Sequence, residues 1–220
     1  CTQSADGFKD ETGMNQVAEQ AGFIAIYPNE DEGIYGCWNW FEDANTLRGR
    51  GQAQELAEGL LGQVKSNENV DEDRVYVAGF SAGAYMVPNL LVEYADVFAA
   101  GGIHSGLEYD AADTATTGTY AMTWGGPDPY YKAEDAYEAM QEYGVTDRVP
   151  TIVFHGESDF TVNDTNGDQA RTQAVETNDL VAGGGVVTTN PDDRIYDSTG
   201  GYDYRRDRYT DTQGRVNVEY

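Results

Sequence analysis

The sequence predicts an α/β fold in which a mostly parallel sheet is covered by helices on both faces. Short apolar runs rich in β-branched residues alternate with longer stretches of helical periodicity, and this alternation continues along the chain. With 220 residues and 40% hydrophobic content, the chain is long enough for a substantial core. We therefore expect residues 1–220 to form a single domain.

The elements expected first are two strands and two helices. Residues 23–27 are expected to form a strand that ends at Pro28. Apolar residues recur at helical spacing over 52–65, which predicts an amphipathic helix. A second strand over 74–78 and a helix over 83–94 follow, with a tight turn between them.

The same alternation continues in the second half of the chain. Strands are expected at 97–103, 151–154 and 215–220, and helices at 133–143 and 170–180. The segment 190–211 is acidic, contains glycine and has little apolar content, so we expect an exposed excursion there. Its tyrosines and arginines could border a substrate cleft, although such segments are more often solvated loops.

The charge of the chain is strongly negative. It has 39 acidic and 13 basic residues, a formal net charge of -26, and the acids are scattered along its length. Self-repulsion on this scale destabilises a compact state unless salt shortens the screening length to roughly 3 Å at about 1 M. A halophilic source is the simplest explanation, and an acidic protein of an ordinary secretome is the alternative. Nucleic acid and anionic membranes are poor partners, and no apolar run is long enough for a membrane span.

The cysteines permit one disulfide. Cys1 and Cys37 are the only two in the chain, and no zinc-type pattern of cysteine and histidine accompanies them. A bridge would imply secretion, and hence an extracellular location. Two unpaired thiols are the alternative.

The segment Gly79-Phe80-Ser81-Ala82-Gly83 carries a candidate nucleophile. It stands between the strand and the helix expected on either side, which is the context that a nucleophile elbow requires. Its glycines let the backbone pass through a sharp turn that a Cβ would obstruct, and the turn presents the serine oxygen at the end of the sheet. We therefore expect Ser81 to be the nucleophile of an α/β-hydrolase fold.

The acid of a catalytic triad follows the nucleophile in this fold and lies just after a later strand. Asp159 meets both conditions, because it comes directly after the strand expected at 151–154. Asp164 and Glu157 are the alternatives.

The third triad member should be a histidine that follows the acid. The chain has only His104 and His155, and both precede Asp159. We expect each to be a buried structural histidine that hydrogen-bonds loop backbone. The chain stops at Tyr220, inside the last expected strand and just where a histidine loop should follow. These features predict an α/β-hydrolase domain truncated at both ends.

The chain resembles the polyhydroxybutyrate depolymerase family, which includes feruloyl and acetylxylan esterases. The similarity is spread over nearly the whole chain, and its Cys-Trp-Asn-Trp-Phe element is more specific than the serine motif. The residues that carry it are Cys1-Thr2-Gln3-Ser4-Ala5, Gly36-Cys37-Trp38-Asn39-Trp40-Phe41, Arg48-Gly49-Arg50-Gly51, 70–79, 97–100, His104-Ser105-Gly106-Leu107, Phe154-His155-Gly156 and Asp159.

The resemblance implies a secreted enzyme that hydrolyses esters. Its oxyanion hole would use a backbone N–H from Cys1 or Thr2 together with that of Ala82. The resemblance also implies a disulfide between Cys1 and Cys37 that would hold Trp38 and Trp40 near the active-site loops. Those tryptophans are expected either to bind substrate or to pack in the core.

The chain departs from the family pattern at three points. The strands expected before Cys1 and the histidine loop expected after Tyr220 are absent, and Pro88 falls inside the helix that follows Ser81. A proline there removes a backbone donor and costs about 3 kcal/mol unless a kink accommodates it.

The leading hypothesis is ester hydrolysis through an acyl-enzyme on Ser81, with no metal and no organic cofactor. The substrate would be a small or polymeric ester: a polyhydroxyalkanoate, or a feruloyl or acetyl ester of a polysaccharide. A non-catalytic hydrolase-fold module that binds polyester or polysaccharide is the alternative, because a chain without the histidine would turn over poorly. Peptidase activity is a third possibility that the Cys-Trp-Asn-Trp-Phe element disfavours.

Overall fold

The computed structural model describes residues 1–30 and 36–220. It divides the chain into two compact units, Cys1–Asn39 and Trp40–Tyr220. Each unit has its own secondary structure, and the first is the smaller. The prediction of a single domain therefore stays a prediction.

The first unit contains two short helices and a disulfide. Helix α1 covers Ala5–Thr12 and α2 covers Met14–Ala21. The hydroxyl of Ser4 caps α1 by accepting a hydrogen bond from the Gly7 N–H at 3.2 Å. The predicted Cys1–Cys37 disulfide is confirmed.

The prediction of a strand over residues 23–27 is wrong. Residues 23–30 adopt no regular structure, and the side chains of Phe23 and Ile24 are 45% and 51% exposed. A strand exists only where a neighbouring strand accepts and donates its backbone hydrogen bonds. This apolar segment has no strand partner among the described residues.

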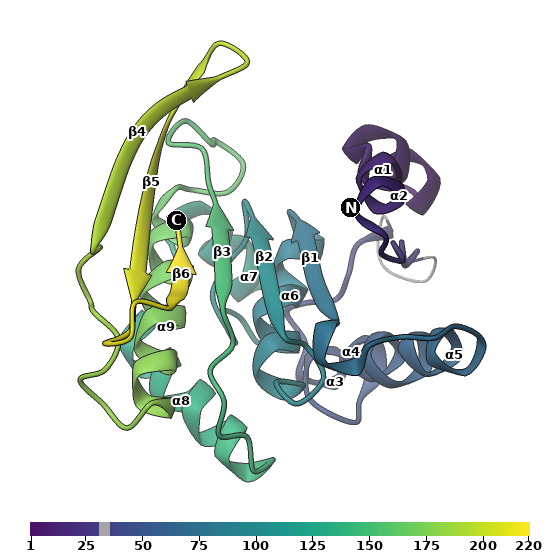
Figure 1. Ribbon diagram of the computed structural model, residues 1–220, viewed down its shortest axis with the longest axis horizontal. Coiled ribbons are helices and arrows are strands. Elements are labelled where there is room, and N and C mark those ends of the chain that lie inside the picture. Colours follow the sequence, from purple (N-terminus) through teal and green to yellow (C-terminus); the bar gives the residue numbers. More distant parts are fainter. Residues whose placement is uncertain (31–35) are drawn as a thin grey trace. The chain divides into compact units, whose positions relative to one another are not determined.

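The second unit is built on a sheet whose described strands follow the order β1-β2-β3-β6-β5-β4. The first four are parallel neighbours, whereas β5 and β4 are antiparallel additions. Figure 1 shows the arrowheads of β1, β2 and β3 pointing the same way. The strands are β1 (Tyr76–Phe80), β2 (Ala100–His104), β3 (Thr151–Phe154), β4 (Asp193–Thr199), β5 (Tyr202–Thr210) and β6 (Val216–Glu219).

The helices of this unit include every one that the sequence predicts. The helix expected over 52–65 is a continuous segment with a π-helical turn at its centre, and α7 was not predicted. No helix in residues 1–30 and 36–220 is long and apolar enough to cross a membrane. The helical elements are α3 (Asp43–Thr46), α4 (Gly51–Gln54), η2 (Glu55–Leu60), α5 (Leu61–Asn67), η3 (Glu72–Arg74), α6 (Ala82–Glu93), α7 (Ala115–Trp124), α8 (Pro129–Glu142) and α9 (Thr165–Val181).

Helix α6 is the centre of the core. All of its residues except Gly83 are buried, and it packs on β1 and β2 while α9 packs on β3 and β6 (Figure 1). A Cβ at Gly101 of β2 would lie 2.5 Å from the Leu91 side chain, so the missing side chain lets the helix approach the sheet. On the opposite face Tyr76, Phe80 and Phe154 are 63%, 42% and 51% exposed. Within the second unit, α6 and α9 therefore pack on the face of the sheet opposite these three side chains.

Pro88 lies inside α6 without ending the helix. The helix continues from Ala82 to Glu93 although Pro88 has no N–H to donate. The Asn89 amide donates to the Tyr85 carbonyl at 2.9 Å, and its Oδ1 accepts from the Asp110 N–H at 3.2 Å. Asn89 thereby joins the turn that contains Pro88 to the loop after β2.

The motif Arg48-Gly49-Arg50-Gly51 forms hydrogen bonds at the C-terminal end of α6 through Arg48. The Arg48 guanidinium donates to both carboxylate oxygens of Asp96, at 2.6 and 2.8 Å, and to the Glu93 carbonyl. Its backbone N–H donates to the buried Glu93 carboxylate, which also accepts from the hydroxyls of Tyr109 and Tyr143. The motif thus has a structural role at the helix end opposite Ser81.

The expectation of a loop over residues 190–211 is wrong, because this segment contains the hairpin of β4 and β5. The two strands pair from Asp193 and Arg208 to Thr199 and Tyr202, leaving Gly200 and Gly201 as a turn with φ of 58° and 85°. Both glycines adopt the left-handed conformation that two-residue hairpin turns require. The segment is exposed as expected, with Tyr196 and Tyr202 73% and 80% accessible.

Candidate active site

Ser81 lies in the sharp turn that joins β1 to α6. Its backbone has φ 52° and ψ −124°, a left-handed conformation that is strained for a residue with a Cβ. A Cβ at Gly79 would overlap the backbone of Gly83, which explains why the motif has glycines on both sides. The turn is fixed by the Ser81 N–H, which donates to the His104 carbonyl at 3.0 Å. This strand-turn-helix geometry is the one that presents a serine oxygen at the edge of a sheet.

The first turn of α6 begins immediately after this serine. Ala82 is the first residue of the helix, so its N–H has no acceptor within the helix. The N-terminal end of a helix also carries partial positive charge, which favours an anion beside Ser81. Cys1 and Thr2 belong to the other compact unit. Their share in an oxyanion hole stays a prediction from the resemblance.

Asp159 is held rigidly in the loop after β3. One oxygen of its carboxylate, Oδ1, accepts hydrogen bonds from the N–H groups of Thr161 and Val162, both at 2.9 Å. Partial burial alone would raise the pKa of Asp159, but those two bonds, a hydrogen bond from the Ser105 side chain and the nearby His155 together lower it. The carboxylate therefore stays ionised and keeps one orientation. Among the described residues, the alternative acid Asp164 makes no side-chain capping bond to α9, and Glu157 is exposed.

The register of the sheet brings the serine and the acid to one edge. Phe80, His104 and Phe154 are neighbours across β1, β2 and β3, so the residues that follow them reach the same level. Two bonds fix that level: Ser81 N–H to the His104 carbonyl, and Ser105 N–H to the Phe154 carbonyl at 2.8 Å. Asp159 lies five residues past Phe154. Ser81, Ser105 and Asp159 therefore stand at the carboxyl ends of three adjacent strands, where ligands of open α/β sheets bind.

His155 has the structural role that the sequence predicts. Its side chain is fully buried, and Nε2 lies 2.9 Å from the Val162 carbonyl across the loop that contains Asp159. A Cβ at Gly167 of α9 would lie 2.7 Å from the His155 ring, so the ring fills the space that this glycine leaves. His155 fixes the acid loop and is inaccessible to a substrate.

His104 differs from the prediction of a buried histidine. It is exposed on the open face of the sheet, where its ring packs edge-on to Phe80 with centroids 5.1 Å apart. Burial of part of the ring and the neighbouring His155 lower the pKa of His104, against a smaller opposite effect of Asp159. Its backbone carbonyl, not its imidazole, contacts the Ser81 turn.

The two tryptophans have different environments. Trp40 is buried, and its ring packs edge-on against Tyr85 with centroids 4.5 Å apart. A Cβ at Gly118 of α7 would lie 2.8 Å from the Trp40 ring, so the tryptophan is wedged between α6 and α7. Trp38 is half-buried in the other unit. Trp40 thus packs in the core, while its neighbour Tyr85 belongs to the helix of the nucleophile.

With this geometry, comparison with known proteins identifies the family. Residues 1–192 match the family described as Esterase PHB depolymerase. The chain belongs to this family. The matched range ends just before β4, so the β4–β5 hairpin and β6 lie outside it.

Relatives in this family are about 30% identical in sequence to this chain over the aligned residues. Poly(3-hydroxyalkanoate) depolymerase C of Paucimonas lemoignei is 31% identical over 172 residues, which cover 77% of this chain and 41% of the relative. Feruloyl esterase B of Thermothelomyces thermophilus is 28% identical over 187 residues, covering 79% of this chain and 61% of the relative. The chain spans about half the length of such curated relatives.

A solved structure shows the same fold. The acetyl xylan esterase from Aspergillus awamori superposes with a TM-score of 0.79, at 23% identity, over 100% of this chain and 78% of that one. The predicted α/β-hydrolase fold is therefore confirmed.

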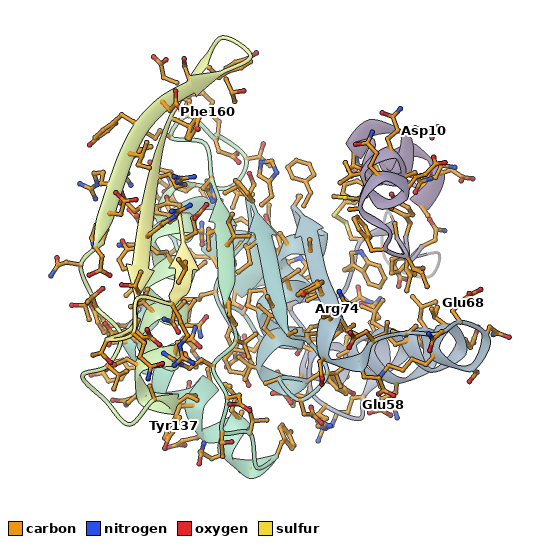
Figure 2. All side chains as sticks on the ribbon, viewed as in Figure 1. Asp10, Glu58, Glu68, Arg74, Tyr137 and Phe160 are labelled. Atoms are coloured by element: carbon orange, nitrogen blue, oxygen red, sulfur yellow. A yellow bond between two sulfur atoms is a disulfide. The ribbon has the colours of Figure 1, made fainter. Side chains whose placement is uncertain are left out.

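Several residues around the esterase-family serine were not predicted. Tyr85 lies one helical turn after Ser81, and Ser105 directly follows β2 with φ 50° beside Asp159. The four-residue spacing from Ser81 is a signal that could have identified Tyr85, because residues i and i+4 share a helix face. Phe160, which is 99% exposed and labelled in Figure 2, directly follows the acid. In the described residues no group of three or more acidic, histidine or cysteine side chains is arranged to hold a metal ion.

Proposed function

We propose that the protein is a serine esterase that hydrolyses carboxylic esters, with Ser81 as nucleophile and Asp159 as the acid that orients a histidine. The observation that carries the proposal is the left-handed backbone of Ser81 between β1 and α6. A strained conformation is retained where function requires it. The fixed, ionised carboxylate of Asp159 two strands away supports the assignment.

The chemistry proceeds in two acyl transfers. Ser81 Oγ attacks the ester carbonyl carbon while its proton passes to a general base, and the N–H of Ala82 donates to the oxyanion. The tetrahedral intermediate collapses, the alcohol leaves with that proton, and the acyl group stays on Ser81. Water then attacks the acyl carbonyl, its proton passes to the same base, and the carboxylic acid is released as Ser81 Oγ regains a proton.

The general base in this proposal is a histidine other than the two in this sequence. His155 is enclosed and bonded to the Val162 carbonyl, and His104 lies on the open sheet face against Phe80. We expect the complete protein to contain a histidine that follows Asp159 in chain order. Determining the full coding sequence checks this expectation directly.

The substrate class follows from the names of the relatives. Polyhydroxyalkanoate, feruloyl and acetylxylan esters are all carboxylic esters on large or repetitive carriers, so we propose a polymeric ester or a small piece of one. The Cys1–Cys37 disulfide supports an oxidising, extracellular location. A panel of these three ester types on the complete protein would distinguish them.

Replacing Ser81 tests the proposal. The complete protein with Ser81→Ala should lose hydrolysis of a short-chain nitrophenyl ester by a factor of about 10³ or more, because no acyl-enzyme forms. Ser66→Ala is the matched control, since Ser66 is exposed and its hydroxyl bonds only the Gly62 carbonyl of its own helix. Persistent hydrolysis by the Ser81 variant would show that another residue is the nucleophile.

The alternative is a non-catalytic module that binds polyester or polysaccharide. The observation that favours it is that the His155 ring is bonded to the Val162 carbonyl and the His104 ring packs against Phe80. If the complete protein contains no later histidine and retains an insoluble polyester without releasing soluble acid, the binding module would be the better description.

A further inference from the structure

Tyr85 is a buried side chain one helical turn from the nucleophile, on the same face of α6. It lies four residues after Ser81 in α6 and is 2% exposed. Side chains of an α-helix lean toward its N-terminus, so the Tyr85 side chain is directed back toward the turn that contains Ser81. The Tyr85 N–H donates to the Ser81 carbonyl at 3.0 Å, so the two residues are one helical turn apart.

The phenol oxygen of Tyr85 is buried and has no completed hydrogen bond among the described residues. Buried tyrosine hydroxyls normally find a partner, and an unmade bond costs about 1–3 kcal/mol. The ring itself is fixed by Trp40, which packs against it edge-on and is wedged beside Gly118. A fixed ring with an unbonded hydroxyl is the arrangement expected where the hydrogen bond forms only during the reaction.

The charges around the phenol keep it protonated. Burial raises the pKa of Tyr85 well above its ordinary value, the nearby Ser81 side chain lowers it by less, and the negative charge of Asp159 raises it further. The phenol is therefore a neutral donor throughout the working range of pH. The two side chains that shift the pKa of Tyr85, Ser81 and Asp159, are the proposed nucleophile and acid.

We propose that Tyr85 is a positioning residue for Ser81, whose phenol donates a hydrogen bond to the serine oxygen as negative charge develops on it. The inference rests on the proposed function. When the acyl-enzyme breaks down, the bond between the acyl carbon and Ser81 Oγ breaks and its electron pair moves to Oγ. The general base returns a proton to that oxygen, while the phenol keeps its own proton and only donates the hydrogen bond.

The test compares two tyrosine variants of the complete protein. Tyr85→Phe should lower kcat for a nitrophenyl ester about tenfold or more with little change in KM, because the bond forms only as charge develops. Its unfolding midpoint in urea should stay unchanged or rise, since the change removes a buried hydroxyl that has no partner. A role limited to packing would move stability and leave kcat unchanged.

Tyr109→Phe is the matched control. The Tyr109 hydroxyl is equally buried but donates to Glu93 at 2.8 Å, so its loss should lower stability and leave kcat of the folded enzyme unchanged. The proposal is overturned if Tyr85→Phe keeps full kcat, or if it loses as much stability as Tyr109→Phe. Activity in Ser81→Ala would instead refute the proposed function, which makes the two failures distinguishable.

Discussion

Glu108 is a carboxyl group buried without a partner. It is 2% exposed, and neither carboxylate oxygen has a hydrogen bond within the described residues. The nearest cation that acts on it, Lys132, is already bonded to Asp110 and Asp135 at 2.7 and 2.8 Å. Burial raises the pKa of Glu108 to about 8, Lys132 opposes that shift, and the charges of Asp128 and Asp110 add to it.

This group should make stability depend on pH in the neutral range. Because its folded pKa of about 8 exceeds the ordinary 4.5, the stability linked to Glu108 is complete below pH 4.5 and is lost as pH rises toward 8. The slope is at most about 1.4 kcal/mol per pH unit. Urea unfolding at pH 5 to 8 should therefore show a difference between wild type and Glu108→Gln that shrinks or reverses with rising pH.

An exposed acid provides the comparison for this series. Glu134→Gln, on the solvent side of α8, should keep a constant difference from wild type over the same pH values. A pH-independent difference for Glu108→Gln as well would mean that Glu108 is ionised in the folded protein.

At the scale of residues, motif context predicts the groups that follow strands. Ser81 and Asp159 could be predicted as candidates because Ser81 directly follows an apolar strand and Asp159 lies in the loop after another, at the edge where such residues gather. Tyr85 was not identified, because a tyrosine inside an apolar helix has the same pattern as a packing residue. It is distinguished by the burial of its hydroxyl, for which the described residues provide no completed hydrogen bond.

Among the secondary-structure elements, the strands that pack against helices could be predicted from the sequence. The runs that became β1, β2, β3 and β6 are short and apolar, whereas β4 and β5 alternate tyrosine, arginine, aspartate and serine with no apolar face. The hairpin is stabilised instead by its ladder and by pairs such as Arg194 with Asp207, at 2.6 and 2.7 Å. The Gly200-Gly201 turn was the signal available in the sequence.

The bond that Asn89 makes within α6 gives a prediction for this element. Asn89→Ala should lower the free energy of unfolding by about 1–3 kcal/mol, because the Tyr85 carbonyl and the Asp110 N–H each lose a buried partner. Asn67→Ala in α5 removes the same kind of amide-to-carbonyl bond, at 2.7 Å to Gln63, from an exposed position where water replaces it. A loss no larger than that of the Asn67 variant would show that the two Asn89 hydrogen bonds do not stabilise this turn.

At the scale of the whole molecule, the net charge of -26 opposes folding. Thirteen basic residues cannot pair with 39 acidic ones, so repulsion among the remaining carboxylates must be screened by salt. Circular dichroism should show the unfolding midpoint rising between about 0.1 M and about 2 M KCl, by more than the ~2–4 °C that corresponds to about 1 kcal/mol.

Sucrose at matched osmolality is the control for the salt series, since it favours compact states without screening charge. An equal rise in sucrose, or a fold that is undiminished at low salt, would contradict the halophile hypothesis. Charge at this scale could be predicted from composition alone. The division into the units Cys1–Asn39 and Trp40–Tyr220 could not, because it depends on which segments pair, and residues 23–30 have a strand-like sequence without a strand partner.

Hydrolysis by the proposed route requires a covalent acyl intermediate on Ser81, and covalent labelling detects such a reactive serine. The complete protein is treated with a fluorophosphonate, which traps activated serines, and the modified peptide is identified by mass spectrometry. We predict a single adduct on Ser81, lost in Ser81→Ala and slowed in Tyr85→Phe. An adduct on a different residue, or undiminished ester hydrolysis with Ser81 unmodified, would show that Ser81 is not the nucleophile.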